Sequence, residues 1–523
     1  MKLEKSTYPK NHSASDFQCF GPPATKDGEF ENTLICDMGC FTQDGKDSNK
    51  FYHGAVVQST KDKSWYSYFE WGRVGAKNPQ FQFVSAASKE AAIRDYCSQL
   101  HEKNDKRGQW IQHPTLGKIL QAKAGKDCYL VRPQASRSTG LPDARTIKFN
   151  EGTNNKPQVS SKSAISKVTA DSKTVALMRD LNVATLSYTK GAMTDDCLPT
   201  FSAISEARDI LSAALSRLSK VGNDLNDQVA DTELNSLTKL IYGRIPKKKD
   251  RGAAPETWIL NQNNITFWQQ DLDAFESALS IEDNQTQTEN DVFGGMSIKM
   301  EWLSPTSENG KFVYNWFPKA TRNRHSYLGK MDIQNVWYVE RKGDVEKIST
   351  YQNKIGNVST REIPLHQPDF RNDLNQEENK IFKGTNTSLL IHGTRSVNVR
   401  GILDKALMLP RNLVGVSITG AMFGPGLYFA DDWKKSAGYT SLSSGLYSSG
   451  SGGIRGRGAF MFLADVVLGD PYVAPRSSGY TSPPNGKHCI FGKAGHSGVQ
   501  NNEWIVFNTN QHRLRYLVEF KVA

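Results

Sequence analysis

The chain lacks the long apolar runs that a membrane protein needs. A helix that crosses a bilayer takes about 20 consecutive, mostly apolar residues, and no run in the sequence approaches that length. The N-terminus, Met1-Lys2-Leu3-Glu4-Lys5, also lacks the apolar core of a secretory signal. These absences argue against a membrane as partner and predict a protein of the cytosol or the nucleus.

The sequence also has no CxxC pair, although it contains seven cysteines. They are Cys19, Cys36, Cys40, Cys97, Cys128, Cys197 and Cys489. Structural zinc sites combine closely spaced cysteine and histidine ligands, and disulfide frameworks use even numbers of cysteines. The scattered, odd set therefore predicts reduced thiols and no metal site.

Acidic residues are outnumbered, since 65 Lys and Arg face 54 Asp and Glu and give a net charge of +11. A basic excess favours a polyanionic partner. Basic residues gather in the first half of the chain, over 103–132 and in the run Lys247-Lys248-Lys249-Asp250-Arg251. This placement predicts nucleic acid as a partner. The run 247–251 is also a candidate nuclear import signal, so we expect the nucleus in a eukaryotic cell and otherwise the cytoplasm or nucleoid.

At 523 residues the chain is too long for one ordinary core, so we expect several domains. The polar stretch 1–30 predicts a flexible arm. Alternating aromatic and polar residues over 31–132 predict an antiparallel sheet with one face in water, followed by one helix that Ser88 caps. Residues 133–170, rich in Ser, Thr, Asn, Lys and Pro, predict a linker.

Residues 171–285 change to an apolar spacing near 3.6, which predicts an all-helical bundle. We expect helices to begin near Val175 and Ile204, the second with Ser205 as its N-cap. Short strands and Gly-rich turns return over 295–523. The predicted fold is therefore multidomain α+β: a small antiparallel β domain with one helix, an all-α bundle and an α+β domain.

Three segments of the last quarter each place one polar residue beside an apolar, strand-like run. His392 lies within 389–395, Tyr428 within 424–431 and Glu503 within 502–507. An unpaired polar atom in an apolar setting costs roughly 1–3 kcal/mol. Three such residues in one domain predict a shared cleft.

The residues around these three resemble a known family. His392-Gly393, the word Gly426-x-Tyr428-Phe429-Ala430-Asp431, the word Lys435-Ser436-Ala437-x-Tyr439 and Asn502-Glu503-Trp504 occur in the order found in the poly(ADP-ribose) polymerases (PARPs). These are ADP-ribosyltransferases of the diphtheria-toxin-like fold. The resemblance implies that this fold occupies 295–523 and that NAD+ is its substrate, with no metal involved.

The chemistry of NAD+ fits these residues. The backbone of Gly393 offers the donor and the acceptor that a carboxamide needs, and the Ser436 hydroxyl adds a third hydrogen bond. The rings of Tyr428 and Tyr439 provide faces for the nicotinamide. Cleavage of the nicotinamide–ribose bond builds positive charge on the sugar, and a fixed carboxylate stabilises that charge. Glu503 is the acid that the motif places there.

The resemblance assigns further roles. It implies that His392 holds the adenosine ribose, that Lys435 lies near the nicotinamide ribose, and that Met422 and Phe423 make apolar contacts on the acceptor side. Met408 stands where DNA-dependent members usually carry an Arg near the adenosine. The segment 493–501 before Glu503 is shorter than usual for the family.

The word Trp71-Gly72-Arg73-Val74-Gly75 follows an aromatic run and resembles the WGR domain of the DNA-dependent members. An indole stacks on a terminal sugar or base, and a guanidinium pairs with phosphate. The DNA-contacting residues that the resemblance implies are Asn49, Trp71, Arg73, Lys106 and Arg107. The alternative that Trp71 belongs to the core and Arg73 is a surface charge stays open.

The helical stretch 171–285 resembles the family's regulatory domain, which shields the NAD+ site until DNA binding loosens it; a passive spacer is the alternative. The sequence thus predicts a DNA-break-activated NAD+ ADP-ribosyltransferase of the DNA damage response. It is expected to modify proteins, including itself, with poly(ADP-ribose) and to release nicotinamide. A mono-ADP-ribosyltransferase on the same scaffold and a catalytically weak scaffold that binds DNA ends both stay open.

Overall fold

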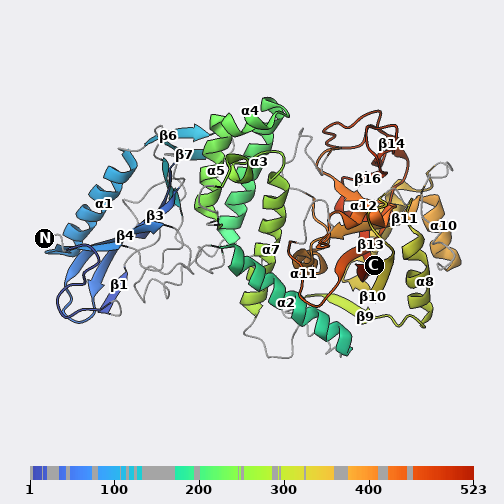
Figure 1. The fold of residues 1–523 in the computed structure, drawn as a ribbon, viewed down its shortest axis with the longest axis horizontal. Helices are drawn as coiled ribbons and strands as arrows, with labels where there is room; N and C mark the ends of the chain where they lie inside the picture. Colours follow the sequence, from blue (N-terminus) through green and yellow to red (C-terminus); the bar gives the residue numbers. More distant parts are fainter. Residues whose placement is uncertain are drawn as a thin grey trace. The chain divides into compact units, whose positions relative to one another are not determined.

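The fold is described from a computed structural model (Figure 1). The structure describes residues 4–13, 16–19, 35–42, 48–73, 80–105, 108–113, 117–122, 127–131, 171–193, 199, 201–245, 247–248, 253–284, 293, 296–322, 325–358, 365, 375–409, 422–443 and 451–523. The linker expected over 133–170 lies outside them. The chain forms two compact units, one of 1–163 with 189–275 and one of 164–188 with 276–523.

The first unit contains a six-stranded antiparallel sheet. Its order is β5-β4-β3-β2-β8, and β1 pairs with β3. The strands are β1 (Phe17–Cys19), β2 (Ile35–Thr42), β3 (Ser48–Ser59), β4 (Trp65–Arg73), β5 (Gln80–Ala86) and β8 (Asp127–Val131). A separate antiparallel pair joins β6 (Gly108–His113) to β7 (Gly117–Ala122). The antiparallel sheet predicted for this region is confirmed.

Apolar side chains occupy both faces of this sheet. Tyr52 and Phe69 lie on the face that α1 (Lys89–Asp105) covers, and Tyr68 and Phe83 lie on the opposite face. Alternate residues of a strand point to opposite faces, so the aromatic pattern of β4 supplies both layers. The sheet thus has two apolar faces, where the sequence predicted one wet face.

The N-terminal stretch differs from the flexible arm expected over 1–30. Residues 4–13 and 16–19 lie against the sheet. The ring centroid of Tyr8 lies 4.7 Å from that of Phe81, and the fully buried ring of Phe17 lies 4.6 Å from Phe83. Two aromatic residues inside a polar stretch are enough to hold it, because each adds apolar area to the second face of the sheet.

The helical stretch contains six helices among its described residues. They are α2 (Ser172–Ala192), α3 (Phe201–Val221), α4 (Leu225–Ala230), α5 (Thr232–Arg244), α6 (Pro255–Trp258) and α7 (Ile265–Asn284). Two of the three boundaries between the units fall inside helices, one in α2 and one in α7. The described residues of this stretch are mostly helical, while the all-helical bundle and its regulatory role stay proposals.

Two of the expected helix starts were wrong. Helix α2 begins before Val175, because Asp171 Oδ1 accepts a hydrogen bond from Thr174 N at 2.8 Å and caps the first turn. Helix α3 begins at Phe201, so Ser205 lies inside it and does not cap it. The buried Ile204 extends the apolar face of this helix toward its N-terminus. Ser88, by contrast, accepts from Ala91 N at 3.2 Å, as its predicted capping role requires.

The second unit contains two sheets. The larger has the order β11-β13-β17-β10-β9, and the smaller has the order β12-β16-β15-β14. The larger is built from β9 (Ile298–Trp302), β10 (Met331–Arg341), β11 (Thr387–Thr394), β13 (Ala459–Val467) and β17 (His512–Val522). The smaller is built from β12 (Leu427–Phe429), β14 (Pro471–Val473), β15 (Cys489–Gly492) and β16 (Glu503–Val506). Its helices are α8 (Glu308–Trp316), α9 (Asp344–Ile355), α10 (Gln376–Gly384), α11 (Ser396–Lys405) and α12 (Trp433–Ala437). This mixed architecture is the α+β fold predicted for 295–523.

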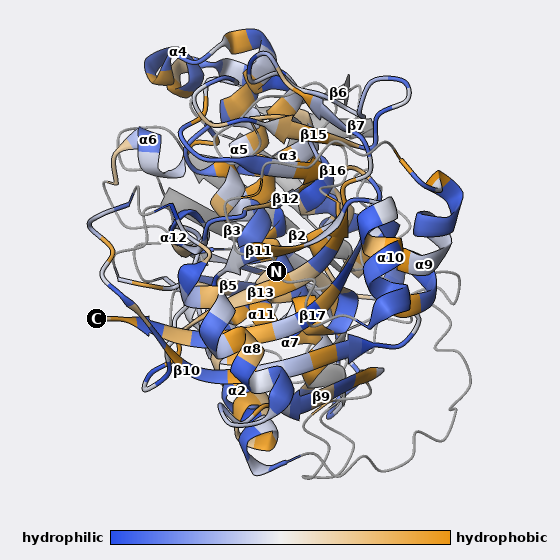
Figure 2. Cartoon of the chain, turned by 90° about the vertical axis from the view of Figure 1, so that its right-hand side faces the viewer, coloured by the Kyte–Doolittle hydropathy of each residue, from blue (hydrophilic) through white to orange (hydrophobic). Residues whose placement is uncertain are grey.

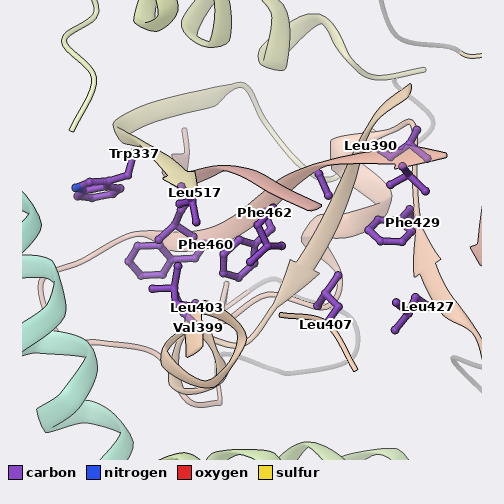
Figure 3. Packing of buried hydrophobic residues seen from close by; sticks show 14 of the residues in the cluster. Trp337, Leu390, Val399, Leu403, Leu407, Leu427, Phe429, Phe460, Phe462 and Leu517 are labelled. Atoms are coloured by element: carbon purple, nitrogen blue, oxygen red, sulfur yellow. The ribbon is translucent and has the colours of Figure 1, made fainter. Parts of the chain in front are cut away.

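A shared apolar layer joins the two sheets of this unit. Phe460, Phe462 and Leu517 from the larger sheet belong to the same buried cluster as Leu427 and Phe429 from the smaller one (Figure 3). Burial of this much aromatic and aliphatic surface, at about 25 cal/mol per Å² of apolar area, fixes the sheets against each other. The polar residues beside Phe429 and Leu427 are therefore carried on a rigid base.

The opposite face of the larger sheet is covered by helices. Trp316 of α8 and Phe382 of α10 pack in one cluster with Met461 and Leu463 of β13. Helix α10 is mostly hydrophilic (Figure 2), and its apolar residues Ile381 and Phe382 are adjacent, with Phe382 buried against the sheet. None of the described helices combines the length and the apolar character that crossing a membrane requires.

Candidate active site

The first component of the site is the end of strand β11, where His392 and Gly393 lie. Ile391 exchanges two backbone hydrogen bonds of 2.9 Å with Ala430, directly after β12. This bridge brings His392 to Tyr428, and His392 Nδ1 lies 3.0 Å from the Tyr428 carbonyl oxygen. A carbonyl only accepts, so Nδ1 carries the proton and Nε2 of the neutral ring is left as an acceptor.

Gly393 is required by a close backbone approach. A Cβ at this position would lie 2.0 Å from the carbonyl oxygen of Ser436, far inside contact distance. The end of β11 and helix α12 therefore touch backbone to backbone. The Ser436 hydroxyl lies 3.5 Å from the carbonyl oxygen of Ile391, two residues before Gly393 on the same strand.

Asp432 fixes the orientation of helix α12. Its Oδ1 accepts from Lys434 N at 2.9 Å and caps the helix, and its Oδ2 accepts from Arg322 N at 2.9 Å. A capping bond of this kind stabilises a helix start by about 1 kcal/mol. The short helix thus presents Lys435 and Ser436 in fixed positions.

Glu503 begins strand β16, opposite Gly492 of β15. Its Oε1 lies 2.9 Å from Lys435 Nζ, and both side chains are largely buried, with 12% and 11% of their surface exposed. The adjacent Asn502 donates from Nδ2 to Asp431 Oδ2 at 2.9 Å. Two contacts in succession therefore attach the start of β16 to the segment between β12 and α12.

Burial controls the charge states around the cleft. It lowers the pKa of His392 below its ordinary value, and the positive charge of Lys435 lowers it further. Burial also raises the pKa of Tyr428, with an added contribution from the negative charge of Glu503. A neutral imidazole and a protonated phenol follow. The Tyr428 hydroxyl donates to Gly424 O and accepts from Phe423 N, both at 2.8 Å.

The acceptor-side residues differ from the expectation in one respect. Phe423 is fully buried, and its ring packs where Gly492 has no side chain, 2.6 Å from the place a Cβ would take. Phe423 therefore supports the turn from inside and does not line the cleft. Met422 is half-buried and stays the acceptor-side contact that we propose.

The remaining predicted residues belong either to the catalytic unit or to the predicted DNA-contacting set. Tyr439 is half-buried just after α12, where its N–H donates to Ser436 O at 3.1 Å, and Met408 is 44% exposed. Trp71 is half-buried at the end of β4, where Nε1 donates to Gln80 Oε1 at 3.0 Å. The side chains of Asn49 and Arg73, and both Lys106 and Arg107, lie outside what the structure describes.

Three polar residues of this site escaped the sequence analysis. Asp431 and Asn502 are buried partners that hold the site, and His512 is a buried imidazole beside it. The ring centroid of Phe429 lies 6.1 Å from that of His392 and 5.9 Å from that of His512. Asp431 and Asn502 stand inside the family words and were detectable there, whereas no pattern marks His512. Among the described residues no group of three or more His, Cys, Asp and Glu is placed to hold a metal ion.

Comparison with known families confirms the resemblance. Residues 307–522 match the model of the poly(ADP-ribose) polymerase catalytic domain, and residues 38–113 match the WGR domain. The chain thus carries a PARP catalytic domain, whose substrate is NAD+, and a WGR domain.

The relatives are distant in sequence. Poly [ADP-ribose] polymerase 1 of Danio rerio is 20% identical over 91% of this chain and 44% of its own length. Poly [ADP-ribose] polymerase 2-A of Oryza sativa subsp. japonica is 22% identical over 91% of this chain and 68% of its own length. The chain spans about half of the length of most of the full-length relatives it matches, such as the 49% of poly [ADP-ribose] polymerase 1 from the same rice.

The close approach at Gly393 gives a first prediction. Gly393→Ala forces a methyl group into the Ser436 carbonyl, so β11 and α12 must separate at the site. We expect NAD+ binding, measured by titration calorimetry, to weaken at least tenfold and the melting temperature to fall. Gly191→Ala is the matched control, because an added Cβ there meets nothing within 4 Å and a helical Ala is favoured by about 1 kcal/mol. Unchanged NAD+ affinity in Gly393→Ala would contradict this geometry.

The buried His512 gives a second prediction. It is 3% exposed, and burial, aided by the neighbouring His392, lowers its pKa to about 3. An unfolded chain protonates its histidines near pH 6.5, so the unfolded state binds more protons between pH 6.5 and 3 and stability falls as the pH falls.

His512→Leu removes this linkage. Urea unfolding at pH 7.5 and pH 5 should show a loss of stability that is smaller by about 1–2 kcal/mol in His512→Leu than in the parent. His496→Leu, at an exposed position, is the control, and its loss of stability between pH 7.5 and pH 5 should equal that of the parent. An identical pH dependence in His512→Leu and the parent would refute the linkage.

Proposed function

We propose that this chain is an NAD+ ADP-ribosyltransferase that DNA breaks activate and that transfers ADP-ribose to proteins, including itself. The observation that carries the proposal is the position of Glu503. Its carboxylate pairs with Lys435, the neighbour of Ser436 in α12, and its negative charge helps to raise the pKa of Tyr428. Desolvation of a charged side chain costs several kcal/mol, and the pairing of Lys435 with Glu503 offsets part of this cost.

The binding step that we propose uses the polar and aromatic groups around Gly393. The backbone N–H and C=O of Gly393 pair with the carboxamide of nicotinamide, and the Ser436 hydroxyl adds a hydrogen bond. His392 Nε2 accepts a hydroxyl proton of the adenosine ribose, because Nδ1 is already engaged with Tyr428 O. The half-buried rings of Tyr428 and Tyr439 provide the stacking surface.

The chemical step breaks the bond between C1′ of the ribose and the nicotinamide nitrogen. The bonding electron pair leaves with nicotinamide, which becomes neutral, and positive charge builds on the sugar. Glu503 hydrogen-bonds the 2′-hydroxyl and stabilises this charge more in the transition state than in the ground state. An acceptor oxygen then bonds to C1′ and loses its proton to the Glu503 carboxylate.

DNA activation is the second part of the proposal. It rests on the WGR match over 38–113, on the basic excess of the first half and on Trp71 at the end of an aromatic strand. Nicks and strand ends are the partners we propose. In a eukaryotic cell the protein is then expected in the nucleus, in DNA repair.

A regulatory role for the helical stretch has physical support in α2. Within the second unit, Arg395 Nη1 donates to Tyr188 OH at 2.8 Å, and Arg400 Nε donates to Asn182 Oδ1 at 3.1 Å. Both arginines are almost fully buried. Arg395 follows Gly393 by two positions in the chain, so a movement of α2 acts directly on the end of β11.

The first test is Glu503→Gln, with Glu301→Gln, at an exposed position of β9, as a matched control. The amide keeps the shape of the side chain and removes its charge. We expect automodification by labelled NAD+ in the presence of nicked DNA to fall by about 10²–10³. NAD+ affinity should change little, and Glu301→Gln should act as the parent.

The products on a denaturing gel separate the open alternatives. A ladder that requires nicked DNA supports a DNA-activated polymerase, and a single shift indicates mono-ADP-ribosyl transfer. No product from the parent protein would favour the scaffold, for which the exposed Met408 in place of an Arg is the physical argument. Undiminished product from Glu503→Gln would exclude that residue from the mechanism.

The second test removes one contact of α2. Tyr188→Phe removes the hydroxyl that accepts a hydrogen bond from the buried Arg395, and leaving that donor unpaired costs about 1–3 kcal/mol. If α2 restrains the site, activity without DNA should rise several-fold while activity with nicked DNA changes less. Val183→Ala, at a position of the same helix that is 64% exposed, is the control and should leave the ratio unchanged. An unchanged ratio in Tyr188→Phe supports the passive spacer.

A further inference from the structure

The N-terminal stretch 4–13 touches the outer edge of the sheet at Ser6 and reaches Ser59 of β3 at His12. Strand β5 forms that edge, and Ser6 N donates to Phe81 O of β5 at 2.6 Å. Gln80, the first residue of β5, lies opposite Trp71 in the sheet. The stretch therefore reaches the same end of the sheet as the indole proposed to contact DNA.

Several contacts hold this stretch in place. Tyr8 packs on Phe81, and His12 Nε2 lies 2.8 Å from Ser59 Oγ. Further along the chain, Asp16 Oδ2 accepts from Lys61 Nζ at 2.9 Å. A chain anchored at these points loses little further entropy when its first residues bind a ligand.

Lys5 is the residue that this anchoring brings to the indole. Its Nζ lies 5.6 Å from the centroid of the Trp71 ring, within the range of a cation–π contact. Ser6 turns the chain beside it with a φ of 59°, a left-handed conformation that an L-residue adopts at a cost. The surrounding contacts stabilise this turn and so fix the position of Lys5 at the edge of the sheet.

The strengths of the two interactions at Trp71 decide which of them prevails when DNA binds. An exposed cation–π contact is worth about 0.5–1 kcal/mol, and stacking of a base on an aromatic ring is worth about 1–3 kcal/mol. A nucleotide therefore displaces the ammonium from the ring face. The anchored chain keeps Lys5 beside the ring, where the phosphate of the stacked nucleotide offers a stronger partner.

We propose that Lys5 is a phosphate-binding residue of the DNA interface, which passes from the Trp71 ring to the phosphate of the nucleotide that stacks there. The N-terminal stretch thereby belongs to the DNA-binding surface. The proposal rests on the proposed DNA binding by the WGR domain and adds Lys5 as a residue that binds a DNA phosphate. Its ligand is a phosphate of a broken strand, either a terminal 5′-monoester or a backbone diester.

The experiment compares Lys5→Ala with Lys10→Ala in the full chain. Both lysines are exposed and lie in the same stretch, so each variant loses one positive charge, but Lys10 makes no described contact with Trp71. Binding to nicked duplexes with a 5′-phosphate or a 5′-hydroxyl at the nick is followed by fluorescence anisotropy between 50 and 200 mM salt, about the range over which such contacts are resolved.

Lys5→Ala should weaken binding several-fold at low salt and lower the slope of log K against log salt by about 0.9, the release expected from one phosphate contact. Lys10→Ala should keep the parent slope, and Lys5→Arg should restore most of the affinity. A loss seen only with the 5′-phosphorylated nick assigns the terminal monoester as ligand. An equal loss with both nicks assigns a backbone phosphate.

An unchanged slope in Lys5→Ala, or tighter binding, would overturn the proposal, and tighter binding would show that Lys5 shields Trp71. Trp71→Ala separates this failure from that of the proposed function. If Trp71→Ala weakens binding and Lys5→Ala does not, only the role of Lys5 is wrong. If both bind as tightly as the parent, the DNA interface is not at this end of the sheet. Equal melting temperatures of the variants show that the fold is intact.

Discussion

The ion pair between Lys435 and Glu503 is the interaction on which the catalytic unit depends. A carboxylate that is largely out of water needs a partner, and the 2.9 Å contact supplies one. Most other features of the site serve to bring these two side chains together. Asp432 caps α12 to direct Lys435, Asn502 bonds to Asp431 to fix the start of β16, and Gly393 lets β11 approach α12. The apolar layer shared by the two sheets gives the strands that carry the site a fixed base.

The parts that the sequence predicted well are those in which local pattern and tertiary contact agree. The family words around His392, Tyr428 and Glu503 led to the catalytic fold, because each word contains both the polar group and the strand that carries it. The aromatic alternation of β4 led in the same way to the antiparallel sheet. The local sequence around these residues is enough to predict their structure, so no contact with residues distant in sequence was needed.

The parts that were missed depend on contacts distant in sequence. Tyr8 and Phe17 hold the N-terminal stretch only because β5 lies beside them, and a polar composition concealed that. Phe423 was predicted as an acceptor-side contact, but its ring is buried in the space that Gly492 leaves by having no side chain. His512 has no motif at all, and its low pKa arises from burial next to Phe429 and His392. The helix that Ser205 was expected to cap begins at Phe201, which shows how easily a serine inside an apolar pattern is mistaken for a boundary.

A crystal structure of the chain with a non-hydrolysable NAD+ analogue tests the central claim most directly. The account predicts that the carboxamide bonds to both backbone groups of Gly393 and that a Glu503 carboxylate oxygen lies about 2.6–3.2 Å from the 2′-hydroxyl of the nicotinamide ribose. A dinucleotide bound in this cleft with Glu503 turned away from the ribose, or a dinucleotide bound elsewhere in the catalytic unit, would contradict it.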